Sequence, residues 1–548
     1  MVAMLDRMTR RIMNRSWISN AVVLGTLAVL STPAFGQQPT KTVQFTLDAT
    51  KDIKPISRFI YGVNQKLDGP YANMTLTRLG GNRWTAYNWV NNASNAGNDY
   101  QFQNDHFLSK SNDPGAAVSE RLDNASERKA ATLLTIPIAG YVATDSNGGG
   151  DVRKSGADYL QTRFRLSLPS KGRPFTLTPD LKDPVYQDEF VNWVKAKYPH
   201  GQADRERPIF FSLDNEPDLW ESTHAQIHPK PVAYSELIEK TIAFAKGIKA
   251  VQPKALVFGP ANYGWAGYVR LQHAPDANNR DFQEVYLQQL AKAEKTGKKR
   301  LLDVLDVHWY PEATGNKIRI SNKSNAPEVV TARLQAPRSL WDPNYQETSW
   351  IAKDALQGPI KLLPRLFEKI TRHYPGTKLA FTEYNYGGGD HISGAIAQAD
   401  VLGIFSRDGV FAACEWPLMD KEPFIAGAFQ MYRNFDGNNG TFGDTSIRAS
   451  TDDVEASSVY ASLDSATGAK VLIVVAINKT DQPLHSVFHL IKAQPQGDGD
   501  IYQLTDTNPE PQSMGKLSIP DPTKLSYTMP AMSVSTIRMR VKVVTKGS

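Results

Sequence analysis

The stretch Ile209–Pro217, which reads IFFSLDNEP, decides the fold more than any other part of the chain. Five mostly apolar residues run directly into an acid, an amide, a second acid and a proline. A buried parallel strand has this composition, and enzymes built on such strands carry their chemistry at the carboxyl ends. Lys378–Asn385 (KLAFTEYN) repeats the pattern, because its apolar run also ends in a glutamate.

Eight short apolar runs of this kind alternate with helical patterns along the first three quarters of the chain. Apolar residues at a spacing of three to four indicate helices at 232–251 and 360–373. Eight strands with intervening helices predict a (β/α)8 barrel with long insertions over 56–445, in preference to a doubly wound sheet. The predicted strands are 59–63, 75–79, 132–136, 209–213, 256–258, 304–307, 378–381 and 410–414.

The pattern changes after residue 450, where apolar and polar residues alternate between turns rich in Gly, Pro and Asp. This alternation predicts an antiparallel β-sandwich over 446–548. Thr42–Leu47, within an N-terminal segment at 37–55, alternates in the same way and could pair into the sandwich. The polar, poorly periodic segments 101–130 and 311–350 are predicted to be long loops at the barrel mouth.

Residues 1–36 have the features of a secretory signal peptide: a basic start, a short apolar run at 21–30 and small residues at 34–36. The alternative is an N-terminal membrane anchor, but the run is short for a span. We therefore expect cleavage near Gly36 and an extracellular or periplasmic protein with no membrane segment in its mature form. Two adjacent arginines, Arg10 and Arg11, indicate the twin-arginine export route only weakly.

Composition excludes several classes of protein. The 548 residues are 41% hydrophobic and 22% charged, as in a globular protein of more than one domain. Loss of four arginines and one aspartate with the signal segment would lower the net charge from +6 to +3, and the remaining charges are mixed. Nucleic acid is therefore not expected as a partner. A single cysteine, Cys414, excludes an intramolecular disulfide and a multi-cysteine zinc site.

Glu216 and Glu383 are the candidate catalytic residues. Each directly follows an apolar run, where a carboxylate is costly to desolvate unless a partner or a function holds it. Two carboxyl groups around one barrel mouth match the requirement of a glycosidase, in which one protonates the leaving oxygen and the other attacks the anomeric carbon. The alternative is a pair of rim carboxylates in ordinary salt bridges.

Aromatic and amide side chains near the strand ends indicate a sugar substrate, because flat rings suit the apolar face of a pyranose and amides suit its hydroxyls. Core tryptophans are the alternative. Trp220 and Trp416 are the strongest candidates among the tryptophans, and His308 is predicted to bond a carboxylate. No HExxH or GxSxG motif is present, which argues against zinc or serine chemistry. The predicted substrate-binding residues are Asn82, Trp84, Asn215, Trp220, Tyr263, Trp265, His308, Tyr310, Tyr384 and Trp416.

At these positions the chain resembles glycoside hydrolase family 44. The resemblance runs from about Phe59 to Trp416, and the matching stretches include TRLGGN, DNEP, DVHWYP, TEYNYGG and IAQADVLG, starting at residues 77, 214, 306, 382 and 396. It implies a retaining endo-β-1,4-glucanase, often active on xyloglucan, with the acid/base at Glu216 and the nucleophile at Glu383. It implies no required cofactor, although some members carry a structural metal ion. Cys414-Glu415-Trp416 departs from the family pattern, which would have an arginine or another polar residue before the tryptophan.

The sequence therefore predicts a secreted glycosidase that cuts xyloglucan or cellulose-type backbones internally. We expect this enzyme to act as a monomer. Xylan or mannan as substrate, or a non-catalytic carbohydrate-binding protein on the same scaffold, are the alternatives. Asn215 is expected to bond the sugar 2-hydroxyl, and Tyr310 to position Glu383. The two carboxyl groups are expected about 5–5.5 Å apart. A cleft open at both ends is expected from the spread of tryptophans over several strand ends.

Overall fold

The computed structural model describes residues 41–202, 204–464 and 470–544. The predicted signal peptide lies outside these residues. Within them, no helix combines the length and the apolar character needed to cross a membrane. The residues from Lys41 onward form one compact unit, so the domain boundaries predicted at 55/56 and 445/446 stay predictions.

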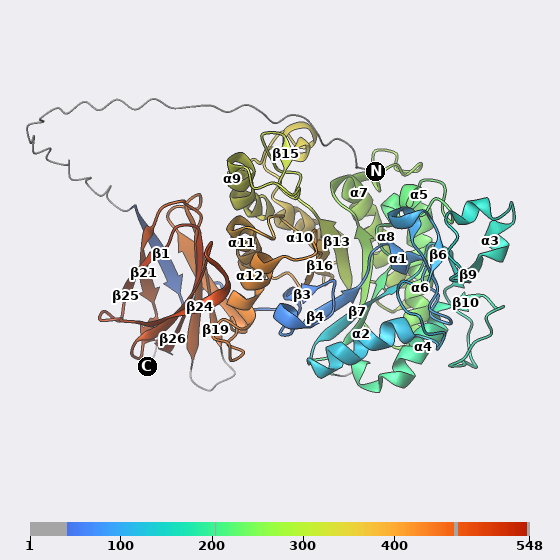
Figure 1. Ribbon diagram of the computed structural model, residues 1–548, viewed down its shortest axis with the longest axis horizontal. Coiled ribbons are helices and arrows are strands. Elements are labelled where there is room, and N and C mark those ends of the chain that lie inside the picture. The colour runs from blue at the N-terminus through green and yellow to red at the C-terminus, as the bar shows by residue number, and fades with distance from the viewer. Residues whose placement is uncertain (1–40, 203, 465–469, 545–548) are drawn as a thin grey trace, which may run out of the picture. The chain divides into compact units, whose positions relative to one another are not determined.

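Eight parallel strands close into a barrel, which confirms the predicted fold class and excludes the doubly wound alternative (Figure 1). Each strand falls on one of the eight apolar runs. Around the barrel the order is β11-β12-β13-β16-β17-β3-β4-β7. The strands are β3 (Gly62–Val63), β4 (Leu76–Leu79), β7 (Ala131–Ile136), β11 (Ile209–Leu213), β12 (Val257–Asn262), β13 (Val304–Trp309), β16 (Lys378–Tyr384) and β17 (Ala412–Glu415).

Helices surround the barrel, and the two helical patterns in the sequence form α6 (Tyr234–Val251) and α10 (Leu362–His373). The other long helices are α2 (Ala116–Glu127), α4 (Gln187–Lys197), α8 (Phe282–Gly297), α9 (Pro327–Gln335), α11 (Ile392–Asp408) and α12 (Pro423–Arg433). Short helices α1 (Asn82–Thr85), α3 (Tyr159–Thr162), α5 (Trp220–Thr223) and α7 (Trp265–Arg270) lie in the connections.

The segments 101–130 and 311–350 are more ordered than predicted. The first contains α2, and the second contains α9 and the small hairpin of β14 (Thr314–Gly315) and β15 (Ile318–Arg319). In α2 only Val118, Leu122 and Ala125 supply the apolar face, so polar residues conceal its helical period. Further short strands form two small sheets: β5 (Ser94–Asn95) with β6 (Asn104–Asp105), and β8 (Tyr141–Ala143), β9 (Phe164–Leu168) and β10 (Val185–Tyr186).

The barrel interior changes from apolar to polar toward the carboxyl ends of its strands. One end is filled by apolar side chains that include Leu133, Phe210 and Phe258. Further along, the buried Asp306 carboxylate accepts hydrogen bonds from Ser212 at 3.2 Å and from Thr382 at 2.6 Å. The polar layer lies under the mouth, which is where a barrel enzyme places its site.

The C-terminal region is a β-sandwich that includes the N-terminal strand, as predicted. β1 (Thr42–Asp48) lies between β18 (Thr445–Thr451), to which it is antiparallel, and β21 (Leu484–Ile491), to which it is parallel. All other pairs in this sheet are antiparallel among the described residues. The remaining strands are β2 (Lys54–Pro55), β19 (Ser457–Asp464), β20 (Val471–Asn478), β22 (Ala493–Pro495), β23 (Gly499–Thr505), β24 (Asn508–Leu517), β25 (Lys524–Met529) and β26 (Ser533–Val543).

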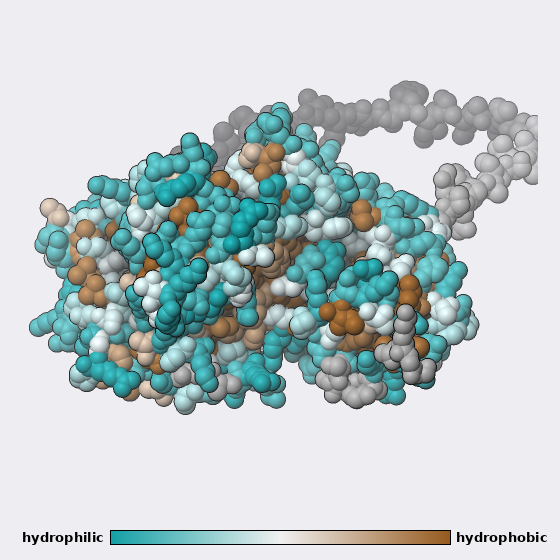
Figure 2. Space-filling model, turned by 180° about the vertical axis from the view of Figure 1, so that it is seen from behind, coloured by the Kyte–Doolittle hydropathy of each residue, from teal (hydrophilic) through white to brown (hydrophobic). Residues whose placement is uncertain are grey.

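Buried polar contacts join the sandwich to α11 and α12 of the barrel. Asp400 accepts a hydrogen bond from Tyr460 at 2.6 Å and forms an ion pair with Lys479 at 2.7 Å, and all three side chains are buried. Figure 2 shows a face of the molecule that is mostly hydrophilic, with apolar residues gathered in a recess. The sandwich is thus fixed to the side of the barrel and does not contribute to the contacts of the two glutamates described below.

Candidate active site

Glu216 stands on a strained backbone at the end of β11. Asp214 and Glu216 have φ angles of 68° and 43°, in the left-handed region that non-glycine residues rarely adopt. Each such residue costs about 1–3 kcal/mol, so the surrounding structure must hold it in place. The Asp214 carboxylate does so by accepting hydrogen bonds from the backbone N–H groups of Ile138 and Ala139. The turn directs Glu216 into the barrel mouth, where 17% of its side chain is exposed.

Glu383 lies within β16 and is held by two donors. Arg78, on β4, lies 2.6 Å from its Oε1, and the Tyr310 hydroxyl donates to its Oε2 at 2.9 Å. Burial raises the pKa of the Tyr310 phenol well above its usual value, so it acts as a donor. A buried guanidinium and a phenol both favour the charged form of the carboxylate they contact. The two donors therefore fix the position of the Glu383 carboxylate.

Arg78 organises the centre of the site, although its role is not evident from the sequence patterns. Its side chain is fully buried, and it also donates to Oδ1 of Asn215 at 2.8 Å and of Asn64 at 3.1 Å. Gly80 leaves room for it, because a Cβ there would lie 2.1 Å from the guanidinium carbon. The available signal was the presence of an arginine inside the apolar run at 75–79, because arginine is rarely buried without a partner.

His308 bridges the two glutamates. Its Nδ1 lies 2.9 Å from Glu216 Oε1 and 3.5 Å from Glu383 Oε2. Burial lowers the pKa of His308 to about 3, against the opposing effect of Glu383, so the imidazole is neutral at pH 7. Its Nε2 faces Arg78 at 3.5 Å, and arginine can only donate, which places the single proton on Nδ1. His308 therefore donates toward Glu216.

The two carboxyl groups are close together. One oxygen of each glutamate and one nitrogen of His308 all lie within 4.8 Å of one another, and the expected separation of 5–5.5 Å between the two carboxyl groups stays a prediction. The pKa of Glu216 is raised to about 7, chiefly by burial, while Arg78 lowers it and Asp99 raises it. Glu216 can thus carry a proton near neutral pH, while Arg78 and Tyr310 hold the Glu383 carboxylate. Such a pair can supply a proton and a nucleophile at the same time.

Two cavities adjoin the network, because one is lined by Glu216 and the other by Gly81, which donates to Asn215. The Glu216 cavity has a volume of about 180 Å³ and is lined by Glu216, Tyr263, Trp265, Trp309, Tyr310, Glu312, Trp350 and neighbouring residues. The Trp416 cavity has a volume of about 550 Å³ and is lined by Gly81, Asn82, Trp84, Asp99, Phe107, Trp416 and neighbouring residues. Gly81 has a φ of 90°, and a Cβ there would lie 2.6 Å from the Trp416 ring, so glycine permits this close approach.

Eight of the ten predicted substrate-binding residues lie at this site. Asn215, His308 and Tyr310 contact the central network described above. The Asn215 Oδ1 also accepts from the Gly81 N–H at 3.1 Å, so its amide N–H₂ is the group left to meet a ligand. Asn82, Trp84, Tyr263, Trp265 and Trp416 line the two cavities.

Trp220 and Tyr384 are placed differently from the prediction. Trp220 is fully buried and packs against His228, with Lys240 over its ring at 5.2 Å. Tyr384 is also fully buried, and its hydroxyl accepts from Gln398 at 2.7 Å. A side chain without exposed surface does not reach a ligand in the cleft, so both residues belong to the core. Proximity to a strand end cannot separate rings that face the mouth from rings that face the helices.

Two exposed aromatic residues at the cavities were not predicted. Phe107 is 73% exposed and lines the Trp416 cavity, with Arg83 over its ring at 4.1 Å. Trp350 is 44% exposed and lines the Glu216 cavity. Both lie in the polar segments that were predicted to be loops at the mouth, and an isolated aromatic residue in a polar loop was the available signal.

Glu216, His308 and Glu383 are also the one group of three acidic, histidine or cysteine side chains that could share a metal ion among the described residues. All three are engaged with each other, with Arg78 or with Tyr310. The structural metal ion that the resemblance implies stays a prediction, and no step proposed below uses a metal.

Two glutamates that face each other at the mouth of a closed (β/α)8 barrel match the arrangement that glycoside hydrolysis requires. Comparison with known proteins agrees. Residues 93–313 match the model of glycoside hydrolase family 44. The chain is 39% identical over 542 residues to Endoglucanase A of Paenibacillus lautus, covering 96% of this chain and 76% of that protein. The chain belongs to glycoside hydrolase family 44.

Two further relatives bear on the substrate. A xyloglucanase of this family from Paenibacillus polymyxa, solved with xyloglucan, has 40% sequence identity and a TM-score of 0.86, covering 91% of this chain and all of that chain (100%). The Beta-mannanase/endoglucanase A of Caldicellulosiruptor saccharolyticus is 40% identical over 505 residues, which are 87% of this chain and 37% of that protein.

Proposed function

We propose that this enzyme is a retaining endo-β-1,4-glucanase that hydrolyses the backbones of xyloglucan and cellulose-type glucans. The observation that carries the proposal is the pair of glutamates at the barrel mouth, with one oxygen of each within 4.8 Å of the other and the pKa of Glu216 raised to about 7. Retaining enzymes place the two carboxyl groups about 5–5.5 Å apart, closer than the about 6.5–9.5 Å of inverting enzymes, which need room for a water molecule.

In the first step, a carboxylate oxygen of Glu383 attacks the anomeric carbon. The glycosidic C–O bond breaks, and Glu216 gives its proton to the leaving oxygen. Glu383 becomes covalently bound to the sugar, and Glu216 becomes a carboxylate. The raised pKa of Glu216, about 7 and caused chiefly by burial, keeps this proton available at neutral pH.

In the second step, Glu216 accepts a proton from a water molecule as the water oxygen attacks the same carbon. The bond between the sugar and Glu383 breaks, and the Glu383 carboxylate is regenerated. Two inversions give net retention of configuration. The proton returns to Glu216, so the cycle needs no other reactant than water.

The neighbouring groups act as positioning residues. Arg78 and Tyr310 fix the Glu383 carboxylate, and His308 fixes Glu216 through its Nδ1–H. The Asn215 amide N–H₂ is the group that we assign to the sugar 2-hydroxyl, because its Oδ1 is already engaged by Arg78 and Gly81. A hydrogen bond at the 2-hydroxyl strengthens in the transition state of glycoside hydrolysis.

Two separate cavities next to the glutamates support internal cleavage, since an endo-acting enzyme must hold the chain on either side of the broken bond. Relatives named xyloglucanase and endoglucanase support a β-1,4-glucan substrate. Mannan is the second candidate, because one relative is named for both activities. We further propose that the enzyme is exported by its N-terminal segment and acts as a monomer without a cofactor.

The test is hydrolysis of xyloglucan, carboxymethylcellulose, xylan and mannan by the purified protein, with viscosity and reducing ends followed together. We expect viscosity to fall early on xyloglucan or carboxymethylcellulose, and the first product observed by NMR to be the β-anomer. An α-anomer as the first product would contradict retention. Release of only glucose or cellobiose without a fall in viscosity would contradict the endo assignment.

A further inference from the structure

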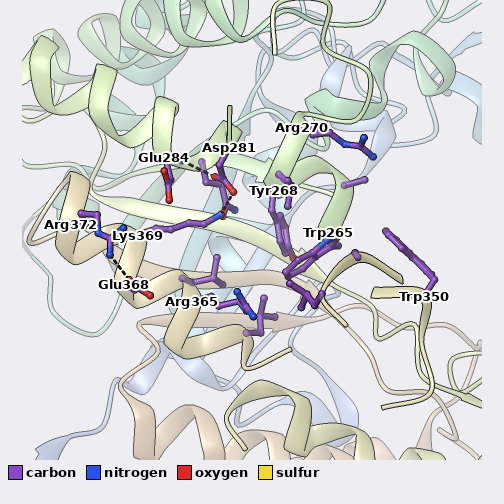
Figure 3. Close-up of a pocket in the computed structure, with 17 residues that line it drawn as sticks. Trp265, Tyr268, Arg270, Asp281, Glu284, Trp350, Arg365, Glu368, Lys369 and Arg372 are labelled. Atoms are coloured by element: carbon purple, nitrogen blue, oxygen red, sulfur yellow. Dashed lines mark hydrogen bonds and ion pairs between the residues drawn. The ribbon is translucent and has the colours of Figure 1, made fainter. Parts of the chain in front are cut away.

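A third cavity, here called the α8–α10 cavity, adjoins the Glu216 cavity. Its volume is about 590 Å³, and it lies between α7, the first turn of α8, the segment 355–356 and α10 (Figure 3). Trp265 and Trp350 line both cavities, so the two spaces meet at these rings. Figure 3 shows both tryptophans at one side of the α8–α10 cavity, with Glu284, Lys369 and Arg372 at the other.

The lining of the α8–α10 cavity suits a neutral sugar. Two of its cations are already neutralised, because Lys369 pairs with Asp281 at 2.7 Å and Arg372 pairs with Glu368 at 2.5 Å. Leu356, Leu362 and Leu366 supply apolar wall, and Trp350 presents a ring that is 44% exposed. A concave site with apolar and aromatic walls and a few polar groups is the usual form of a small-ligand site. Arg270 and Arg365 also line the cavity, so four cations face the three carboxylates of Asp281, Glu284 and Glu368 and the lining carries a net charge of +1. This small excess favours a neutral ligand over a highly charged one.

The position of Glu216 determines in which direction the sugar chain lies in the cleft. As general acid, Glu216 must lie beside the leaving oxygen, so the leaving part of the chain occupies the Glu216 cavity. We assign the other part of the chain to the Trp416 cavity, which adjoins the site through Gly81 and its hydrogen bond to Asn215. A leaving chain that continues beyond the Glu216 cavity passes Trp265 and Trp350 and enters the α8–α10 cavity, because these two rings line both spaces.

We propose that the α8–α10 cavity binds the reducing-end portion of an unbranched β-1,4-glucan backbone, with Trp350 as the residue that guides the chain into it. This inference rests on the proposed retaining mechanism, because the direction of the chain follows from Glu216 as acid. It adds to that mechanism a binding site outside the barrel mouth, between two helices of the outer ring.

The experiment maps the cleaved bond in cellohexaose labelled at its reducing end, with wild type and Trp350→Ala. Loss of Trp350 should lower kcat/KM on cellohexaose about 5–20-fold, as expected for one exposed aromatic contact. The cut should also shift toward the reducing end, because fewer sugar units are then held on the leaving side. Trp350→Phe keeps a ring and should restore most of both properties. Ala355→Phe places bulk in the same cavity without touching Trp350 and should shift the cut in the same direction as Trp350→Ala.

Phe107→Ala is the matched control, because Phe107 is an exposed aromatic residue on the opposite, Trp416 cavity. It should shift the cut toward the non-reducing end. An unchanged cleavage pattern in both Trp350→Ala and Ala355→Phe would overturn the proposal. So would an effect confined to branched xyloglucan oligosaccharides, which would make this a site for branches. Failure of the proposed function would differ, since wild type itself would then leave cellohexaose intact or give an inverted product.

Discussion

Glu216 and Glu383 are the same residue type at the same barrel mouth, yet different side chains hold them. Glu383 receives a buried guanidinium and a phenol as donors, at 2.6 and 2.9 Å. Glu216 receives a neutral imidazole at 2.9 Å, and burial is the main reason that its pKa is raised to about 7. The difference shows that neighbouring side chains, rather than the carboxyl groups themselves, assign the acid and the nucleophile.

The largest expected effect comes from removing one carboxyl group at a time. Glu383→Ala should abolish turnover on every glycoside, because no group remains to attack the anomeric carbon. Glu216→Ala should slow hydrolysis of polymers about 10²–10⁴-fold, the usual contribution of a general acid, and slow the first step on an aryl glycoside much less. Initial rates on carboxymethylcellulose and on an aryl cellobioside measure this contrast.

Added azide separates the two roles by stereochemistry. In Glu383→Ala, azide fills the space of the missing carboxylate and gives a glycosyl azide of inverted configuration. In Glu216→Ala, azide attacks the covalent intermediate and gives the retained configuration. NMR of the two products reads the result directly. The reverse pattern would show that the acid and the nucleophile have been assigned the wrong way round.

The sequence predicted the barrel well because each strand is encoded locally. An apolar run followed by polar residues, as in Ile209–Pro217, is sufficient to mark a strand and its functional end. The same local signal located Glu216 and Glu383. It could not reveal Arg78 as the partner of Glu383, because the two residues are 305 positions apart and meet only through closure of the barrel.

Side-chain direction was the second limit of the sequence. Trp220 and Trp265 both follow strand ends, yet one is fully buried and the other lines the Glu216 cavity. Their placement depends on how the connections fold over the mouth, which no local period encodes. For the same reason, Trp350 and Phe107 could be placed at the cavities only once the structure showed how the polar segments around them fold.

Arg78→Met would test how the guanidinium acts on the two glutamates, since it pairs with Glu383 and lowers the pKa of Glu216. Removing one partner of a buried pair leaves the other charge uncompensated, which typically costs about 3–5 kcal/mol. We expect a lower free energy of unfolding, a large loss of kcat/KM and a basic limb of the rate profile that moves to higher pH, because the pKa of Glu216 rises when the positive charge is lost. Arg163→Met is the control, since it breaks a 2.7 Å ion pair with Asp145 away from the two glutamates and should lower stability without moving the profile.

If Arg78→Met does not fold, Arg78→Lys keeps a charge at the site and remains measurable. It should retain the position of the basic limb better than it retains the rate, because a lysine keeps the positive charge but lacks the planar fork that also holds Asn215. A profile in Arg78→Lys that shifts as far as in a neutral variant would refute the electrostatic role.

Glu415 and Glu422 sharpen the comparison, because they are two buried carboxyl groups that share an amide donor and have no ion pair with a cation among the described residues. Asn385 donates to Glu415 at 2.8 Å and to Glu422 at 3.4 Å. Burial and the neighbouring Glu422 raise the pKa of Glu415 well above its usual value, and burial raises the pKa of Glu422. A group whose pKa is raised on folding contributes stability below its unfolded pKa and loses it as pH rises through the folded pKa. The free energy of unfolding should therefore fall toward alkaline pH.

Glu415→Gln cannot ionise and should flatten that dependence between neutral and alkaline pH, as measured by urea unfolding at a series of pH values. Glu455→Gln is the matched control, because the Glu455 side chain is 79% exposed and its change should leave the slope unaltered. Equal slopes in wild type and Glu415→Gln would mean that the pair does not hold a proton in the folded state.

The smallest expected effect, and the finest test of the comparison, is at Asp99. This exposed carboxylate lines the Trp416 cavity. Among the influences that raise the pKa of Glu216, its charge is smaller than the effect of burial. Asp99 accepts a hydrogen bond from the Asn82 side chain at 2.7 Å. Asp99→Asn keeps an oxygen that can accept this bond but removes the negative charge. The pKa of Glu216 should fall, so the basic limb of kcat/KM should move to lower pH by roughly half a unit or less, the size expected for a solvent-screened charge. Because salt screens such a charge, the shift should shrink between about 0.01 M and 1 M ionic strength.

Asp113→Asn is the control, because it changes another exposed aspartate, and it should move neither limb. A shift to higher pH, or one of equal size at both salt concentrations, would show that Asp99 acts on the fold of the cavity and not on the proton of Glu216.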